Sequence, residues 1–277
     1  MKCFYHSADL DGYCSGAIVK TKYPDCELIG INYGDEFPWE RIEKTEIVFM
    51  VDFSLPMAEM DRLNRLSMLV WIDHHKSAIE EAEAAGFLAL GGQLLEIGRA
   101  GCELTWRWCY PYTRIPHAVY LLGRYDVWQH HEVPGALEFQ YGMRGQEDTR
   151  PENLMFWEGL FESQGMQVAT IIEEGRMLLA YEERQNAMYV KSCAFEVEFD
   201  GLRCIAVNRG LTNSLIFKSV YDPAKHDAML SFVRRPGKWT VSLYSDKAEV
   251  DVSAICKARG GGGHKGAAGF QCAALPF

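Results

Sequence analysis

The stretch MLVWIDHHKS, residues 68–77, begins with five consecutive apolar residues and continues with an acid and two histidines. A continuous apolar run of this length is typical of a strand buried on both faces of a parallel sheet. KCFYH at 2–6 and EIVFMVDF at 46–53 have the same character. The three runs therefore predict a parallel sheet in the first third of the chain.

Segments with helical periodicity alternate with these runs, at 11–23, 56–67 and 77–86. Alternation of strand and helix implies right-handed crossovers and a doubly wound α/β domain. Helical patterns then dominate from about residue 115 and end in a long periodic stretch at 168–190. This stretch predicts a helix that joins two domains.

Strand-like patterns return after the long helix, at 192–201, 202–208 and 238–245. They predict a smaller mixed α/β domain. A length of 277 residues agrees with two domains, because it is long for a single core. We therefore expect three parts, with the active-site cleft between the first and the last: a catalytic domain at 1–165, a linker helix at 166–191 and a substrate-binding domain at 192–277.

The composition is that of an ordinary globular protein, with 48% apolar and 24% charged residues. Nine cysteines without a C-x-x-C pair argue against a disulfide framework or a structural zinc site, and they fit a reducing cytoplasm. No signal-peptide pattern or bilayer-spanning apolar run is present in the sequence. A net charge of −10 disfavours long duplex nucleic acid, but a metal site would still admit a small phosphate ester.

Acids and histidines follow each predicted strand of the first domain. The first strand is followed by His6, Asp9 and Asp11, the second ends at Asp52, and the third ends at Asp73, His74 and His75. The carboxyl ends of parallel strands meet at one edge of a sheet, so these side chains are expected to converge.

Carboxylates crowded in this way repel one another unless cations offset their charge. Oxygen and imidazole ligands without thiolates favour Mn²⁺ or Mg²⁺ over structural zinc. Two such ions, bridged by one carboxylate and one water, would supply a hydroxide-like nucleophile and a clamp for a phosphodiester.

Each cluster also has a simpler interpretation. Asp9 and Asp11, beside Gly12, suit a turn and a helix cap, and Asp52 suits a cap for the helix that follows. The two histidines would then be ordinary loop residues. The coincidence of three clusters at three strand ends favours a metal site over capping alone.

Five ordered segments span nearly the whole chain: HSADLDG, VDFS, IDHHKS, GRYDVW and GGGGHKGAAGF. Together they resemble the motifs of the DHH phosphoesterases that carry the type 1 DHH-associated C-terminal domain. Within that family, the chain length and the uninterrupted two-domain layout are most similar to the short-oligoribonucleotide (nano-RNA) hydrolases and related nucleotide phosphodiesterases.

The resemblance implies that six residues hold two Mn²⁺ ions: His6 and Asp9 one ion, Asp11, His74 and Asp126 the other, and Asp52 both. His75 would hydrogen-bond the scissile phosphate or assist the leaving group, and Asp73 would orient the adjacent histidines. Two residues separate His6 from Asp9, where several relatives have three. Without the resemblance, Asp126 would be interpreted as a helix-end residue.

The glycine run near the C-terminus is expected to face the substrate, because a nest of backbone N–H groups suits a phosphate. The residues concerned are Gly260, Gly261, Gly262, Gly263, His264 and Lys265. The alternative is a flexible surface linker. Arg99 and Arg209 are weaker candidates for phosphate contact. Many relatives have an arginine in a Ser-x-Arg-Ser strand, where this chain has Tyr244, which offers an aromatic face for stacking a base.

The leading hypothesis is a cytoplasmic, Mn²⁺-dependent phosphodiesterase that hydrolyses short single-stranded oligoribonucleotides to mononucleotides. Mg²⁺ or another divalent ion is an alternative metal. A cyclic mono- or dinucleotide phosphodiesterase, or a nucleotide bisphosphate phosphatase, would use the same chemistry. An alternative of another class is a metal-bound nucleotide-binding module without turnover. No membrane partner is expected, and a homodimer is compatible with the sequence.

Overall fold

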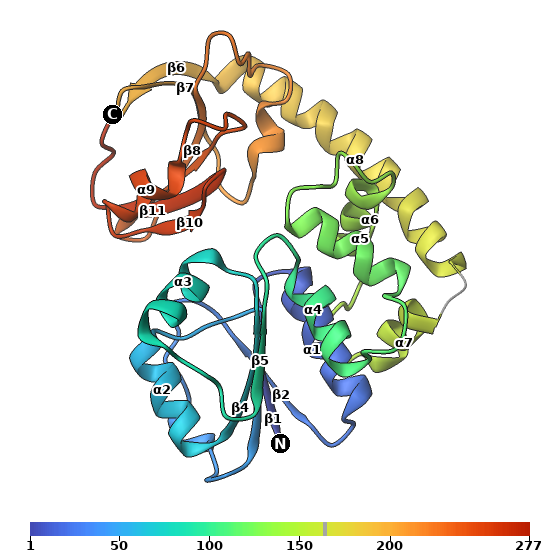
Figure 1. The fold of residues 1–277 in the computed structure, drawn as a ribbon. Coiled ribbons are helices and arrows are strands. Elements are labelled where there is room, and N and C mark those ends of the chain that lie inside the picture. Colours follow the sequence, from blue (N-terminus) through green and yellow to red (C-terminus); the bar gives the residue numbers. More distant parts are fainter. Residues whose placement is uncertain (163–164) are drawn as a thin grey trace. The chain divides into compact units, whose positions relative to one another are not determined.

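The computed structural model describes residues 1–162 and 165–277 (Figure 1). It divides into two compact units, Met1–Leu179 (unit 1) and Ala180–Phe277 (unit 2). Each unit contains one β-sheet, parallel in unit 1 and mixed in unit 2, so the predicted fold class is confirmed. The segment predicted as a linker helix lies within helix α8, Met166–Cys193, which runs from unit 1 into unit 2.

All five strands of unit 1 are parallel and lie in the order β2-β1-β3-β4-β5. Their bounds are β1 Lys2–His6, β2 Glu27–Ile31, β3 Ile47–Val51, β4 Met68–Asp73 and β5 Gly92–Leu95. The three central strands are the apolar runs predicted from the sequence. The two edge strands, β2 and β5, were not predicted, because their side chains are largely half-buried or exposed and form no continuous apolar run.

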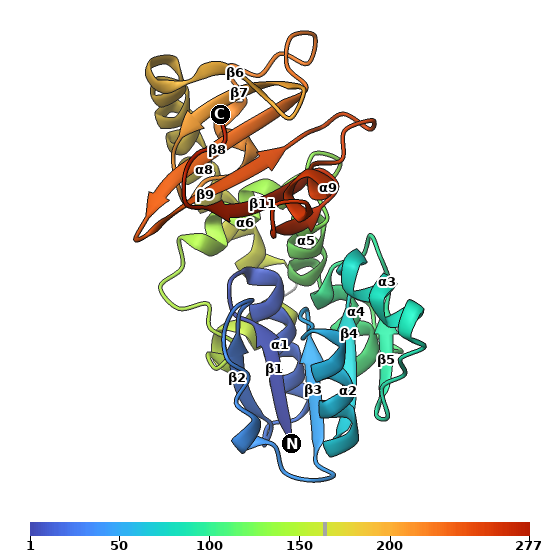
Figure 2. The same ribbon diagram turned by 90° about the vertical axis from the view of Figure 1, so that its left-hand side faces the viewer.

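Alternate side chains of the central strands enter two apolar cores, one on each face of the sheet. One core includes Tyr5, Val51 and Ile72, and the other includes Phe4, Met50 and Trp71. The first face is covered by α1 Leu10–Lys22, α4 Gly101–Cys109, α5 His117–Asp126, α6 Ala136–Arg144, α7 Leu154–Glu162 and the start of α8. The second is covered by α2 Met57–Leu66 and α3 Lys76–Ala85 (Figure 2). The short 3₁₀ helix η1, Trp39–Arg41, also packs against this second core.

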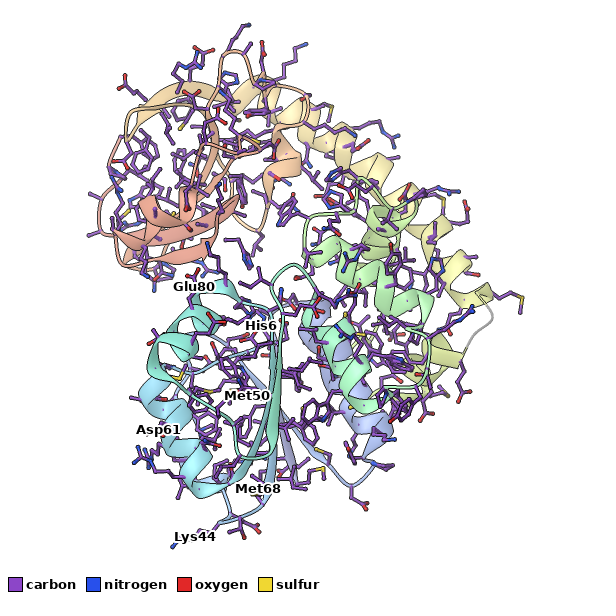
Figure 3. The ribbon with its side chains drawn as sticks, viewed as in Figure 1. His6, Lys44, Met50, Asp61, Met68 and Glu80 are labelled. Atoms are coloured by element: carbon purple, nitrogen blue, oxygen red, sulfur yellow. The ribbon has the colours of Figure 1, made fainter. Side chains whose placement is uncertain are left out.

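Strand register brings the functional residues of unit 1 to one edge. Val51 pairs with Tyr5 of β1 on one side and with Ile72 of β4 on the other. The residues that follow these three are therefore neighbours at the carboxyl edge. Figure 3 shows His6 at this edge and Met68, the first residue of β4, at the opposite edge.

Unit 2 is built on a six-stranded sheet in the order β10-β11-β9-β8-β7-β6. The elements are β6 Phe195–Phe199, β7 Leu202–Asn208, η2 Ser214–Phe217, β8 Ala228–Arg235, β9 Lys238–Tyr244, α9 Val252–Lys257, β10 Gly262–His264 and β11 Ala267–Cys272. β7 and β8 pair in parallel, and the other described neighbours are antiparallel. Among the described helices of the whole chain, none combines the length and the apolar character needed to cross a membrane.

Candidate metal centre

The six predicted metal ligands lie together at the carboxyl edge of the unit 1 sheet. We call this group the ligand cluster: His6, Asp9, Asp11, Asp52, His74 and Asp126. Their ligand atoms form two compact sets in which all atoms lie within 4.8 Å of one another. One set is His6, Asp9 and Asp52, and the other is Asp11, His74 and Asp126.

Asp52 belongs to the first set and also faces the second. Its Oδ1 is 3.1 Å from Nε2 of His74, and its Oδ2 is 3.7 Å from Nδ1 of His6. The residue is 1% exposed, and its backbone has a positive φ of 53°. Asp tolerates this left-handed conformation better than most side chains do. A carboxylate with one oxygen toward each set has the arrangement that a bridging ligand requires.

Asp9 combines two functions. Its Oδ1 accepts a hydrogen bond of 3.0 Å from the Gly12 amide and so caps helix α1, as the simpler interpretation expected. Its Oδ2 remains 3.0 Å from Nδ1 of His6. Burial alone would lower the pKa of His6, but the adjacent carboxylates of Asp52 and Asp9 raise it to about 10. Capping therefore accounts for one oxygen of Asp9 and leaves the other available to a cation.

Asp11 is held at the start of helix α4. Its two oxygens accept hydrogen bonds of 2.8 Å from the amides of Gly101 and Cys102, where the helix dipole favours a negative charge. A Cβ atom at Gly101 would lie 2.6 Å from Cβ of Asp52 and 3.0 Å from Oδ2 of Asp11. Sequence reasoning missed Gly101, because nothing in RAGCEL reveals which distant carboxylates approach its backbone.

Asp126 completes the second set from the last residue of helix α5, with Oδ2 3.4 Å from Nε2 of His74. The helix end is fixed by its neighbour Arg124, whose Nη2 lies 2.8 Å from both carboxylate oxygens of the fully buried Glu103. This bidentate ion pair ties α5 to α4 beside the ligand cluster.

The donor set fits divalent cations. Nε2 of His74 lies within 3.7 Å of oxygens from Asp52, Asp126 and Asp11, but a single N–H can satisfy only one of them. Nδ1 of His6 is buried and makes no hydrogen bond of good geometry. Burial and the charge of Asp11 raise the pKa of both Asp52 and Asp126 well above the usual range. Crowded carboxylates and an unsatisfied imidazole nitrogen are what a bound metal ion would satisfy.

Asp73 organises the two histidines that follow it. Its Oδ1 accepts hydrogen bonds from the amides of His74 (2.7 Å) and His75 (3.2 Å), and it lies 2.7 Å from Nδ1 of His75. Burial would raise the pKa of Asp73, but the charge of His75 and these hydrogen bonds outweigh it and hold the pKa low. Asp73 is completely buried, so its carboxylate fixes the orientation of the His75 ring from behind.

Tyr33 is a further residue of this region that sequence reasoning missed. Its ring lies 4.6 Å from that of Phe53, 5.6 Å from that of His6 and 6.1 Å from that of His75, and the residue is 57% exposed. It follows the edge strand β2, which was not predicted from the sequence. Recognising that strand would have placed Tyr33 at the same sheet edge as the ligand cluster.

The glycine run of unit 2 is not a slack linker, because it leads into strand β10, which pairs with β11. Gly260 and Gly263 have positive φ angles of 76° and 140°. A Cβ atom at Gly261 would lie 2.0 Å from the carbonyl oxygen of Gly269, whereas one at Gly262 would meet nothing within 4 Å. Turn conformation and close packing therefore explain three of the glycines, and they leave Gly262 unexplained. His264 and Lys265 are exposed beside them.

Two weaker candidates have other partners. The prediction that Tyr244 stacks on a base is not supported, because the residue is 9% exposed within an apolar core of unit 2 and its hydroxyl donates to the carbonyl of Thr212 at 3.2 Å. Arg99 is 3.0 Å from Oε1 of Glu96 and 3.2 Å from Oε2 of Glu103. Its charge is thus offset by two carboxylates in unit 1.

Comparison with solved structures shows which fold this is. The DHH domain of a member of the s1p family of ribosomal proteins superposes with a TM-score of 0.54, at 15% identity over 97% of this chain and 81% of that chain. The fold is that of DHH-domain proteins. An exopolyphosphatase-related protein from Bacteroides fragilis has a TM-score of 0.53, at 13% identity over 99% of this chain and 87% of that one.

Another structure with this DHH-type fold is the pGpG-specific phosphodiesterase PggH from Vibrio cholerae, with a TM-score of 0.52 at 12% identity over 98% and 92% of the two chains. At the sequence level, the uncharacterized protein R106 of Acanthamoeba polyphaga mimivirus is 25% identical over 312 aligned positions, which cover 99% of this chain and 68% of that protein. No model of a known protein family matches the chain.

Proposed function

We propose that this protein is a divalent-metal-dependent phosphodiesterase of the DHH type that hydrolyses short oligonucleotides to mononucleotides. The observation that carries the proposal is the pair of three-residue sets joined by Asp52 and His74, whose closest atoms are 3.1 Å apart. Two adjacent oxygen- and imidazole-rich sets that share a carboxylate suit two-metal phosphoryl chemistry better than any single-ion structural role.

The ligand cluster would hold two Mn²⁺ ions, or Mg²⁺ ions in their place. When bound, the ions would supply positive charge to the phosphoryl oxygens and a hydroxide-like nucleophile at neutral pH. Asp52 would serve both ions, and the α4 amides would hold the Asp11 carboxylate in place.

His75 is the proposed proton donor to the substrate. Asp73 accepts from Nδ1, so in the imidazolium the Nε2–H would be the donor to the substrate. Burial lowers the pKa of His75, but the charge and hydrogen bond of Asp73 raise it above its usual value, so the imidazolium persists to higher pH. A donor of this kind would stabilise the leaving oxygen as the bond to phosphorus breaks.

Two observations guide the choice of substrate class. One structural neighbour is named for its specificity toward pGpG and another as exopolyphosphatase-related, so both linear nucleotides and polyphosphate belong in the substrate panel. The exposed ring of Tyr33 beside His6 is a suitable face for a base or ribose. The nine cysteines all lie in described residues as free thiols, which agrees with the proposed cytoplasmic location.

The test is turnover of 5′-phosphorylated di- and trinucleotides by the full chain with Mn²⁺ or Mg²⁺, alongside cyclic dinucleotides, a nucleoside 3′,5′-bisphosphate and polyphosphate. Mononucleotide release with the highest kcat/KM for the linear dinucleotides is the expected result. A higher kcat/KM for another member of the panel would change the proposed substrate and leave the proposed metal-dependent hydrolysis in place. Binding without turnover of any member would identify a nucleotide-binding module instead.

His75→Gln separates catalysis from metal binding. We expect kcat to fall by about 10²–10⁴-fold, the usual contribution of general acid–base catalysis, while the bound metal per chain stays at the wild-type value. His74→Gln is the matched comparison, because it should lose metal as well as activity. Equal metal loss in both variants would show that His75 is itself a metal ligand. The structure permits this outcome, because His75, Asp52 and His74 form a third compact set of possible ligands.

A further inference from the structure

Unit 2 contains a pocket of about 540 Å³ beside strands β8 and β9 and the loop that follows β7. We call it the arginine pocket. Three arginines and four hydroxyl-bearing residues line it: Arg209, Arg234, Arg235, Thr212, Ser231, Thr240 and Ser242. No acidic side chain contributes to its lining. In a chain with a net charge of −10, three cations gathered without a carboxylate call for an explanation.

Two other arginines of unit 2 have carboxylate partners. Arg203 lies 2.9 Å from Asp227, and Arg259 lies 2.8 Å from Asp200. Within residues 1–162 and 165–277, none of the three arginines of the pocket forms such an ion pair. The Arg209 guanidinium lies over the ring of Tyr189 at 4.7 Å, which holds the side chain in place without neutralising it.

Three of the hydroxyl groups lie on neighbouring strands. Ser231 of β8 is directly opposite Ser242 of β9, and Val233 is opposite Thr240, so the three hydroxyl-bearing residues project from the same face. Ser231 is 4% exposed, and Oγ1 of Thr240 is buried without a hydrogen-bond partner in the described chain. This face therefore has hydrogen-bonding capacity that the protein itself does not use.

The loop after β7 forms a close wall of the pocket. A Cβ atom at Gly210 would lie 2.9 Å from the side chain of Val233, so glycine permits the loop to pack directly on β8. The next residue, Leu211, is fully exposed with a positive φ of 52°. A left-handed backbone is unfavourable for a leucine, and such strain is commonly retained where a binding site requires it.

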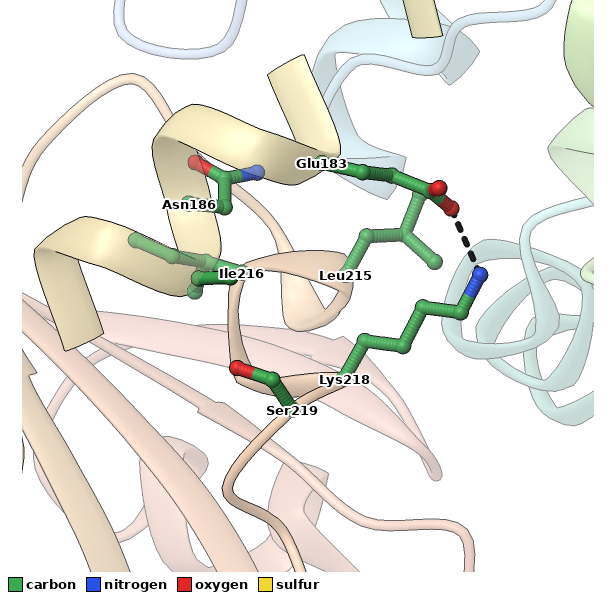
Figure 4. Close-up of a pocket in the computed structure, with 7 residues that line it drawn as sticks. Glu183, Asn186, Leu215, Ile216, Lys218 and Ser219 are labelled. Atoms are coloured by element: carbon green, nitrogen blue, oxygen red, sulfur yellow. Dashed lines mark hydrogen bonds and ion pairs between the residues drawn. The ribbon is translucent and has the colours of Figure 1, made fainter. Parts of the chain in front are cut away.

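A second cavity of unit 2 provides a contrast. It has about 310 Å³ and lies between α8 and η2 (Figure 4). Its cation, Lys218, is 2.5 Å from the carboxylate of Glu183 in the same cavity wall. The charge there is already compensated, so this cavity has no comparable demand for an anion.

We propose that the arginine pocket binds a phosphate-bearing ligand. Guanidinium groups match the geometry of phosphate oxygens, and serine and threonine hydroxyls donate to the same atoms. The Arg234 guanidinium lies over the Trp239 ring at 5.5 Å, whereas Arg235 alternates to the strand face of Ser231 and Val233. The cations proposed for the ligand are therefore Arg209 and Arg235. Two positive charges suit a polyphosphate or a terminal phosphate monoester better than a single carboxylate. The site uses residues of unit 2 alone and stands independently of the proposed metal chemistry.

Calorimetric titration of the full chain with inorganic tripolyphosphate in EDTA tests this site without bound metal. We expect saturable binding that weakens as salt is added. Arg209→Gln and Arg235→Gln should each weaken it about tenfold, as expected for loss of one charge-assisted hydrogen bond. Arg184→Gln on α8 is the matched control, because it removes an exposed charge outside the pocket and should leave the affinity unchanged.

Two further measurements keep the result decisive. Ser242→Ala should weaken tripolyphosphate binding while the Tm stays at the wild-type value, which separates ligand contact from misfolding. The second measurement compares a dinucleotide with and without a 5′-phosphate, both in EDTA. Binding of only the phosphorylated form would identify a nucleotide terminus as the ligand. Binding of tripolyphosphate but of neither dinucleotide would identify free polyphosphate. No binding by the wild type at millimolar concentration, or equal weakening by Arg184→Gln, would overturn the proposal.

Discussion

Asp52 has an imidazole on each side, with His74 at 3.1 Å and His6 at 3.7 Å, and it is almost completely buried. Burial and the charges of Asp11 and Asp9 raise its pKa well above the usual range. A raised pKa in the folded state means that this group stabilises the metal-free fold at low pH. That stabilisation is lost as the pH rises through the folded-state value.

Asp52→Asn should therefore have opposite effects on the metal-free and metal-loaded protein. The metal-free variant should be at least as stable as the wild type at pH 7–8, because the amide removes the repulsion among carboxylates. With Mn²⁺ present, the kcat of the variant should be about 10³-fold below that of the wild type, and Mn²⁺ should no longer raise the Tm of the variant. Thermal unfolding with EDTA and with Mn²⁺, together with turnover, measures all three. A variant that keeps the Mn²⁺-dependent Tm increase would contradict the bridging role.

At the scale of single elements, the start of helix α4 is as important as the strands. Its first two amides fix Asp11, and the absence of a side chain at Gly101 lets the helix approach Asp52. The carboxylates are thus positioned by a helix whose sequence contributes none of the six ligands.

Gly101→Ala should weaken metal binding without removing any ligand. Its Cβ would lie 2.6 Å from that of Asp52, and overpacking of this kind costs about 1–3 kcal/mol. We expect a rise of about tenfold or more in the Mn²⁺ concentration needed for half-maximal activity. Gly98→Ala is a nearby control with no atom within 4 Å of the added methyl group, although its φ of 86° adds backbone strain. Unchanged metal dependence in Gly101→Ala would show that α4 can shift freely.

Two neighbouring glycines at the β10–β11 hairpin allow a structural role to be tested separately from a role in substrate binding. Gly261→Ala should lower the Tm by several degrees, because its methyl group would collide with the carbonyl of Gly269. Gly262→Ala has open space and should fold as the wild type does, yet raise KM if a substrate phosphate approaches this backbone. Unfolding and steady-state kinetics on the two variants provide the comparison. An unchanged KM in Gly262→Ala would remove the support for phosphate binding by the glycine run.

On the scale of the whole molecule, all six proposed ligands belong to unit 1. Divalent ions at about 100 times their Kd should stabilise the fold to which they bind by about 2.7 kcal/mol. Hydrogen exchange should therefore slow in β1, β3, β4 and α4 when Mn²⁺ is added, and remain unchanged in β8 and β9. Protection that appears first in unit 2 would mean that the metal binds elsewhere.

Much of this arrangement follows from the sequence. The buried strands β1, β3 and β4 were predicted because each is a continuous apolar run ending in an acid or a histidine. The edge strands β2 and β5 were not predicted, since half-exposed strands carry no such run, and Tyr33 was missed with β2. Gly101 could not be found either, because its importance depends on side chains 49 to 90 residues away in the chain.

The position of the ligands along the chain has a consequence for how the protein is made. The last proposed ligand is Asp126, and the core that supports it is completed by Ile171 of α8, before unit 2 begins. At ribosomal rates of about 5–20 residues per second, unit 2 needs roughly a further 5–20 s to emerge. The proposed ligand cluster can therefore be complete, and metal binding can begin, while the chain is still attached to the ribosome.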